Sequence, residues 1–123
     1  MKTKLFIILT TLLFVVNGLT AQNRQQVSPE ERANRQTEAL TKRLDLNEEQ
    51  KQKVYDIVLK YSKQRSSQRD SDMSREKRME EFQKIQQQEA EEIKAVLTEE
   101  QQKEYDKYQK ESRDRRNSNR RQR

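Results

Sequence analysis

The chain of 123 residues contains no cysteine, no histidine and no tryptophan, and it has only one glycine and one proline. Without His or Cys it lacks the most common general base, a strong nucleophile and the soft metal ligands. The single glycine, Gly18, cannot form a glycine-rich loop of the kind that holds phosphate. Glutamates are abundant, but no deep pocket is expected around them. We therefore expect neither an enzyme nor a protein that holds a cofactor or metal ion.

Apolar residues are also scarce, whereas charged residues make up 39% of the chain. This composition is close to that of disordered proteins, because little apolar surface is available to offset the entropy lost on folding. The apolar residues nevertheless recur at helical spacing, which predicts a thin helical structure. We expect a second copy of the chain to share the core, so that the protein is a homodimer.

The one long apolar run, LFIILTTLLFVV at positions 5–16, follows two lysines near the N-terminus. A basic start, an apolar stretch and the small residue Ala21 are typical of a cleavable secretory signal peptide. The alternative is an uncleaved anchor, but a membrane span needs about 20 apolar residues. We therefore expect residues 1–21 to be removed after export and residues 22–28 to form a flexible segment.

A helix-start signal opens the part of the chain that we expect to fold, residues 29–112. Ser28 can cap a helix, Pro29 suits the first helical position, and Glu31 completes a capping box. Apolar residues then recur at helical spacing up to Leu44, where the first helix is expected to end. The same reasoning predicts three further helices, which makes the domain all-α.

A five-residue pattern occurs twice in this domain, as LNEEQ and as LTEEQ. In each copy the second residue can cap a helix and the final glutamine can complete a capping box with it. The two glutamates lie in the first turn, where the helix dipole favours negative charge, and the leucine can act as a hydrophobic staple. Each copy is therefore predicted to fix a tight joint between two helices. The key positions of the two copies are Leu46, Asn47, Gln50, Leu97, Thr98 and Gln101.

The second predicted helix contains VYDIVLKY at positions 54–61, which is apolar around about half of the helix. Either both apolar stripes are buried, one of them across a dimer, or part of this segment is an exposed adhesive surface. The following residues, 63–72, are all polar, so they form either the solvated end of this helix or a bend.

A third helix is expected from about Asp72 or Ser74 to Leu97. Gln86 and Glu89 interrupt its apolar stripe, either because they meet solvent or because they line a half-wet groove. A fourth helix is expected to follow the second copy of the motif and to run to about Ser112.

The C-terminal residues 113–123 contain six arginines and one aspartate and show no apolar periodicity. This pattern predicts a disordered tail. Its charge suits the phosphates of anionic lipid or lipopolysaccharide, or it only keeps the protein soluble. The remaining alternative is nucleic-acid binding through these arginines, but nucleic acid is not an expected partner, because the chain is expected to be exported. The arginines of the tail are Arg113, Arg115, Arg116, Arg120, Arg121 and Arg123.

The two motif copies resemble the LTxxQ motif, which occurs twice in the Spy/CpxP family of small periplasmic proteins. The second copy fits in full, whereas the first has Asn47 in place of threonine. The resemblance implies a four-helix bent hairpin that dimerises into a thin, curved cradle in the periplasm. It also implies an ATP-independent chaperone for unfolded or partly folded envelope proteins, or a regulator that binds the periplasmic domain of an envelope-stress sensor kinase. Zinc-binding relatives use His or Cys, and this chain has neither.

A chaperone of this kind needs a surface that adapts to many partners. Aromatic side chains and methionine serve this purpose, because they make large contacts and tolerate varied geometry. The expected contact residues are Tyr55, Leu59, Tyr61, Met79, Phe82, Tyr105 and Tyr108.

Overall fold

The computed structural model describes residues 26–122, and all regular secondary structure in that range is helical. The chain forms α1 (Pro29–Leu44), α2 (Glu48–Arg69), α3 (Arg75–Ala95) and α4 (Glu99–Arg121). The prediction of an all-α domain with four helices is thus confirmed. Residues 1–25, with the expected signal peptide, and Arg123 lie outside the described residues.

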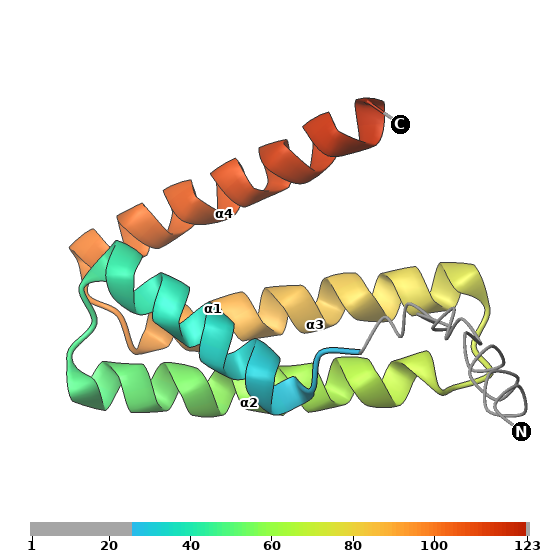
Figure 1. The fold of residues 1–123 in the computed structure, drawn as a ribbon, viewed down its shortest axis with the longest axis horizontal. Coiled ribbons are helices and arrows are strands. Elements are labelled where there is room, and N and C mark those ends of the chain that lie inside the picture. Colours follow the sequence, from blue (N-terminus) through green and yellow to red (C-terminus); the bar gives the residue numbers. More distant parts are fainter. Residues whose placement is uncertain (1–25, 123) are drawn as a thin grey trace, which may run out of the picture.

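The four helices build an antiparallel hairpin with two further helices laid against it (Figure 1). α2 and α3 run side by side in opposite directions and form the hairpin. α1 crosses over the hairpin and packs on α2 and on the first part of α4. The turns between α1 and α2 and between α3 and α4 lie at the same end of the molecule, on the left in Figure 1. From there α4 diverges from the hairpin towards its C-terminus.

The helix ends are made with polar caps and without glycine. The Ser28 Oγ accepts a hydrogen bond from the backbone N–H of Glu31 at 3.1 Å, and α3 begins with a similar cap at Ser74. α1 ends at Asp45, whose φ of 53° is left-handed and lets its N–H donate to the Thr41 carbonyl. Aspartate tolerates this conformation better than most residues, although glycine is the usual choice.

The hydrophobic core lies where α1 crosses the hairpin and meets the start of α4. Leu40, Val54, Val58 and Ile93 are fully buried there. These side chains are buried within one chain, without a contribution from a second copy. The homodimer expected from the shortage of apolar residues therefore stays a prediction.

The C-terminal tail differs from its prediction. Residues 113–121, expected to be disordered, continue α4, which the sequence pattern ended near Ser112. No glycine or proline interrupts the chain after Pro29, and arginine, lysine, glutamine and glutamate all favour helix. Arg120 and Arg121 also lie in the last turn, where the helix dipole favours cations. The lack of apolar periodicity indicated that the segment is not packed, and it did not mean that the segment is not helical.

The polar stretch 63–72 is the solvated end of a helix over most of its length. α2 continues through it to Arg69, and the bend towards α3 follows. α3 then begins after Ser74 and ends at Ala95, two residues before the expected Leu97. The hairpin therefore extends well past the segment that α1 covers (Figure 1).

Candidate functional site

The two copies of the repeated motif meet each other at the end of the hairpin. Gln50 Nε2 donates to Gln101 Oε1 at 2.7 Å, and Gln101 Nε2 donates back to Gln50 Oε1 at 3.2 Å. Each Nε2 also donates at 3.1 Å to a backbone carbonyl of the other joint, which is Val96 for Gln50 and Leu44 for Gln101. The two joints are thus related by an approximate twofold symmetry, and each holds the other in place.

Each glutamine also closes the capping box of its own helix. The backbone N–H of Asn47 donates to Gln50 Oε1 at 3.2 Å, and that of Thr98 donates to Gln101 Oε1 at 3.0 Å. In return the two cap side chains accept from the backbone N–H groups of the glutamines, at 2.8 and 3.3 Å. Both amides are fully used in this network, so the joint is expected to be rigid. Leu46 and Leu97, the staple positions, are both buried beside it.

A buried carboxylate, Glu89 of α3, lies between α1 and α2. Its Oε2 is 2.6 Å from Arg65 Nη1, and its Oε1 accepts from Gln36 Nε2 at 3.2 Å. The side chains of Arg65 and Glu89 are only 11% and 6% exposed. Burial lowers the pKa of Arg32, as do the guanidinium groups of Arg69 and Arg65 nearby, whereas Glu89 opposes this effect. Arg65 therefore forms the ion pair with this buried carboxylate, and Arg32 lies near it.

Both alternatives predicted for Glu89, contact with solvent and the lining of a half-wet groove, are wrong. Glu89 does not meet solvent and does not line a wet groove, because Arg65 and Gln36 use both of its oxygens. Gln86, by contrast, is exposed, which agrees with the alternative that it meets solvent. The sequence contains a signal for the Arg65–Glu89 ion pair. Glu89 occupies an apolar position of α3, and Arg65 continues the inward stripe of Val54 and Val58 on α2.

Two of the predicted contact residues are buried and are not part of a free surface. Tyr61 is 4% exposed and Tyr105 is 3% exposed. The Tyr61 hydroxyl donates to Glu92 at 2.5 Å, and the Tyr105 hydroxyl accepts from Gln109 Nε2 at 2.8 Å. Their rings face the core, because the stripes that carry them point inwards.

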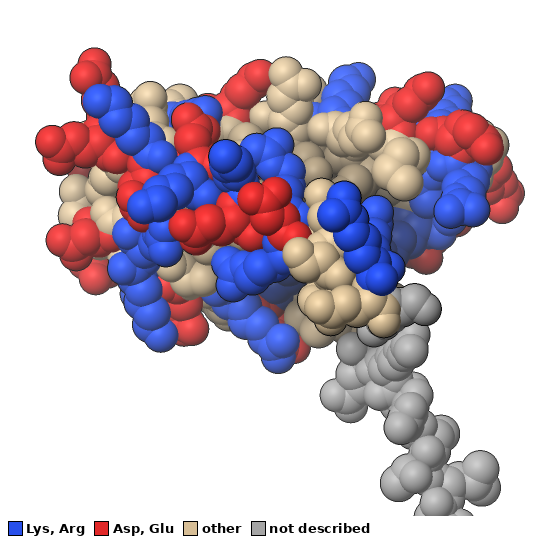
Figure 2. Space-filling view, turned by 90° about the horizontal axis from the view of Figure 1, so that it is seen from above, with Lys and Arg blue, Asp and Glu red and all other residues tan. Residues whose placement is uncertain are grey.

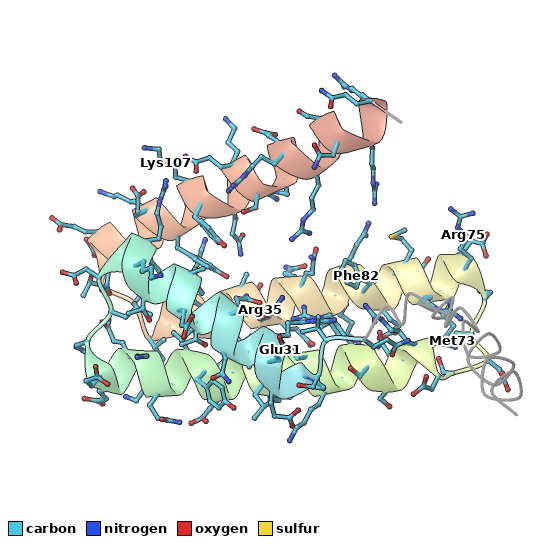
Figure 3. All side chains as sticks on the ribbon, in the orientation of Figure 1. Glu31, Arg35, Met73, Arg75, Phe82 and Lys107 are labelled. Atoms are coloured by element: carbon cyan, nitrogen blue, oxygen red, sulfur yellow. The ribbon has the colours of Figure 1, made fainter. Side chains whose placement is uncertain are left out.

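The other predicted contact residues fall into two groups. Tyr55, Leu59 and Tyr108 are partly buried and pack against the core. Met79 and Phe82 are 50% and 38% exposed and are the large apolar residues on the surface of the described chain. They lie about one turn apart on α3, and Figure 3 shows Phe82 on the part of the hairpin that α1 leaves uncovered.

The surface of the described chain is densely charged, with both signs mixed. Figure 2 shows lysine and arginine side chains interspersed with acidic ones over the face seen from above, with an uncharged area right of centre. Exposed ion pairs within this surface include Lys53 with Glu49 and Lys60 with Glu92, at 2.7 and 2.6 Å. Such pairs contribute little to stability but keep the surface hydrated. Of the tail arginines, the five within the described residues, all but Arg123, are exposed along the end of α4.

No helix within residues 26–122 is long and apolar enough to span a membrane. Over the same residues, no three Asp, Glu, His or Cys side chains gather in a way that could hold a metal ion. The side chains that are present, exposed guanidinium groups and two apolar residues on an open helical surface, suit reversible binding.

The fold and the joint define a small, all-α, highly charged protein whose two motif copies lock against each other. The chain belongs to the family described as a domain of unknown function (DUF4890), whose sequence model matches residues 19–105. The match includes α1 to α3, both motif copies and the first turns of α4, and it ends before the arginine-rich part. Comparison with curated proteins and with solved structures finds no match.

The buried tyrosines predict a loss of stability at high pH. Burial raises the pKa of Tyr105 to about 12, and burial followed by the hydrogen bond to Glu92 raises the pKa of Tyr61. A raised pKa means that the fold favours the neutral phenol, so this stabilisation is complete below about pH 10 and is lost as the pH rises towards 12. We expect the midpoint of thermal unfolding to fall over this range, and Tyr105→Phe to reduce the fall. An unchanged pH profile in the variant would contradict this role of Tyr105.

Proposed function

We propose that this protein is an ATP-independent holdase that binds unfolded or partly folded proteins of the cell envelope. The observation that carries the proposal is the exposed pair Met79 and Phe82 on the uncovered end of the hairpin. A folded protein with so few apolar residues would be expected to bury both. Leaving them on an otherwise charged surface supports a role in contact with other chains.

The physical properties of this surface fit weak and reversible binding. Two half-exposed apolar side chains offer too little area for a permanent complex, but enough to hold an unfolded segment briefly. Methionine is flexible and adapts to differently shaped partners, while the mixed charges around it speed the encounter. Such a surface can release a client without ATP.

The resemblance of the joint to the LTxxQ motif adds support from a second direction. Proteins of the Spy/CpxP family with this motif form bent helical hairpins, dimerise into thin cradles and act in the periplasm. For this chain we propose the same location, after removal of residues 1–21, and a homodimer in which two hairpins form one cradle. The exposed pair of each copy would then lie on a shared binding surface.

The proposal is tested by the aggregation of a chemically denatured client on dilution, without ATP. The protein is expected to suppress light scattering, and the double variant Met79→Gln/Phe82→Gln to be about thirtyfold less effective, because about 1 kcal/mol of apolar contact is lost at each site. The matched control Gln87→Ser/Glu91→Gln changes two exposed residues on the far side of α3 and is expected to behave as the original protein.

Three outcomes would count against this reading. No suppression at stoichiometric excess would remove the holdase function. Equal activity of the Met79 and Phe82 variant, with helical content unchanged by circular dichroism, would remove this surface as the binding site. Capture of one saturable envelope protein in a pull-down, instead of many clients, would favour an adaptor of a sensor kinase.

A further inference from the structure

The inner face of the last turns of α4 is lined with arginine. Successive helix residues are rotated by about 100°, and the buried Tyr105 marks the direction of the rest of the molecule. Residues 113, 115, 116 and 120, all arginines, then lie within about 80° of that direction. Asp114, the one acidic residue of this segment, lies on the opposite side. The arginine-rich end of α4 thus turns its positive charge inwards.

Further arginines lie on α1 and α2. On α2, the inward stripe that begins with Val54 and Val58 continues with Arg65, which is buried in its ion pair with Glu89, and with the exposed Arg69. Arg32, near the start of α1, lies close to both of these arginines, as the lowering of its pKa by them indicates. One acid, Glu89, lies among them, and it is buried against Arg65.

α3 contributes the apolar part of this surface. Its inward stripe of Ile85, Glu89 and Ile93 continues with Phe82, and Met79 lies one turn beyond. By the same rotation, residues 76, 80 and 91, all glutamates, lie on the far side of α3. The α3 stripe thus adds two apolar side chains, while Glu81 and Glu92 lie on the flank opposite Met79, where Glu92 is paired with Lys60.

We call this region the basic wedge. It is bounded by the diverging end of α4 on one side and by the end of the hairpin that carries the α2–α3 turn on the other (Figures 1 and 3). Figure 3 places Lys107 on the outer side of α4, away from the wedge, as the helical rotation requires. The members of the basic wedge are Arg113, Arg115, Arg116 and Arg120 of α4, Arg32 of α1, Arg69 of α2, and Met79 and Phe82 of α3.

We propose that the basic wedge binds acidic, amphipathic polypeptide segments, with carboxylates against its arginines and apolar side chains against Met79 and Phe82. This inference rests on the proposed holdase function and names its preferred clients. Arg113, Arg116 and Arg120 are spaced at i, i+3 and i+7, so they form one row about 10 Å long. A helical or nascent helical segment with acidic residues at matching spacing would pair with this row.

The observations favour a polypeptide over other polyanions. Guanidinium groups pair with carboxylate and phosphate alike, so charge alone does not choose between them. The apolar pair within the wedge selects an occupant that carries apolar groups among its charges. An extended nucleic acid would instead use stacked aromatic side chains, and Phe82 is the one aromatic residue of the wedge.

Two matched variants of α4 test the inference. The inner variant carries Arg→Gln at positions 113, 115, 116 and 120, and the outer variant carries Gln in place of Lys103, Lys107, Lys110 and Arg121. Each removes four positive charges from exposed positions of the same helix, so the net charge is identical. The probe is a fluorescent peptide with aspartates and leucines on one helical face, and binding is measured by fluorescence anisotropy at two salt concentrations.

The inner variant is expected to bind the acidic peptide about tenfold or more weakly than the original protein, and the outer variant to lose about threefold or less. A peptide with lysine in place of aspartate is expected not to bind. Equal losses in the two variants would overturn the inference, because net charge alone would then explain binding. Circular dichroism of both variants is expected to show the helical content of the original protein.

Other occupants are tested in the same assay with a single-stranded oligonucleotide and with vesicles that contain phosphatidylglycerol. If the oligonucleotide or the vesicles bind more tightly than the acidic peptide, and the inner variant alone loses this binding, then the occupant is not a polypeptide.

Failure of the holdase function can be told apart from failure of the basic wedge. If both variants still suppress aggregation of a basic client, the proposed holdase function is upheld. The peptide assay then tests by itself whether the basic wedge binds acidic segments. If the original protein binds the peptide but suppresses no aggregation, the holdase fails.

Discussion

Replacement of Glu89 by alanine is expected to lower the free energy of unfolding by about 3–5 kcal/mol. The carboxylate is held between Arg65 and Gln36 in a nearly dry site. Without it, the guanidinium group of Arg65 stays buried with no compensating charge and with Arg32 and Arg69 close by. A loss of this size is a large fraction of the stability of a small domain, which is about 5–15 kcal/mol. Urea unfolding followed by circular dichroism measures it.

The double variant Arg65→Met/Glu89→Leu separates the cost of an unpaired charge from the value of the pair. Removal of both charges leaves no buried ion, so its stability is expected to lie within about 1 kcal/mol of the original protein. A double variant as unstable as Glu89→Ala would show that Glu89 acts through packing. A Glu89→Ala protein of unchanged stability would show that the site is wet enough to hydrate Arg65.

The paired glutamines of the joint are expected to show the strongest coupling in the molecule. Gln50→Ala and Gln101→Ala should each cost about 2–3 kcal/mol, since each removes a capping interaction and leaves buried polar groups of the other joint without partners. The double variant should cost about 1–2 kcal/mol less than the sum of the two, because the same amide pair is lost only once. Denaturant unfolding of the original protein, the two single variants and the double variant measures this coupling as a double-mutant cycle.

Gln87→Ala is the control for the joint, since Gln87 is an exposed glutamine on α3 and its loss is expected to change stability by no more than about 0.5 kcal/mol. Strict additivity of the Gln50 and Gln101 variants would contradict the coupled joint. It would mean that the two capping boxes act separately, as the sequence alone predicts, and that the contact between the amides contributes nothing.

The helices themselves were predictable because their signals are local. Ser28, Asn47 and Thr98 are good caps followed three residues later by a partner, and the structure begins a helix after each. These interactions join residues three positions apart, so they need no knowledge of the rest of the fold. The tail shows the limit of this reasoning. Apolar periodicity reports packing, and a segment without packing can still be helical.

The candidate surface was only partly predictable, because burial depends on which helices meet. Tyr61 and Tyr105 were chosen as contact residues for their chemistry, and α1 and the neighbouring helices bury both. Met79 and Phe82 have the same apolar character but stay exposed, because α1 does not reach their part of the hairpin. Composition names the side chains that can bind, and helix lengths and crossings decide which of them can be reached.

The sequence by itself determined the all-α class, the helix starts and the repeated motif, because hydrogen bonds and periodicities within one helix set them. Only the tertiary structure decided that Gln50 and Gln101 bond to each other, that Glu89 is buried beside Arg65, and that the α4 arginines turn towards the hairpin. Each of these depends on residues that are far apart in the chain. Their meeting follows from how the helices cross, since the packing of a few buried side chains, and not local preference, sets that crossing.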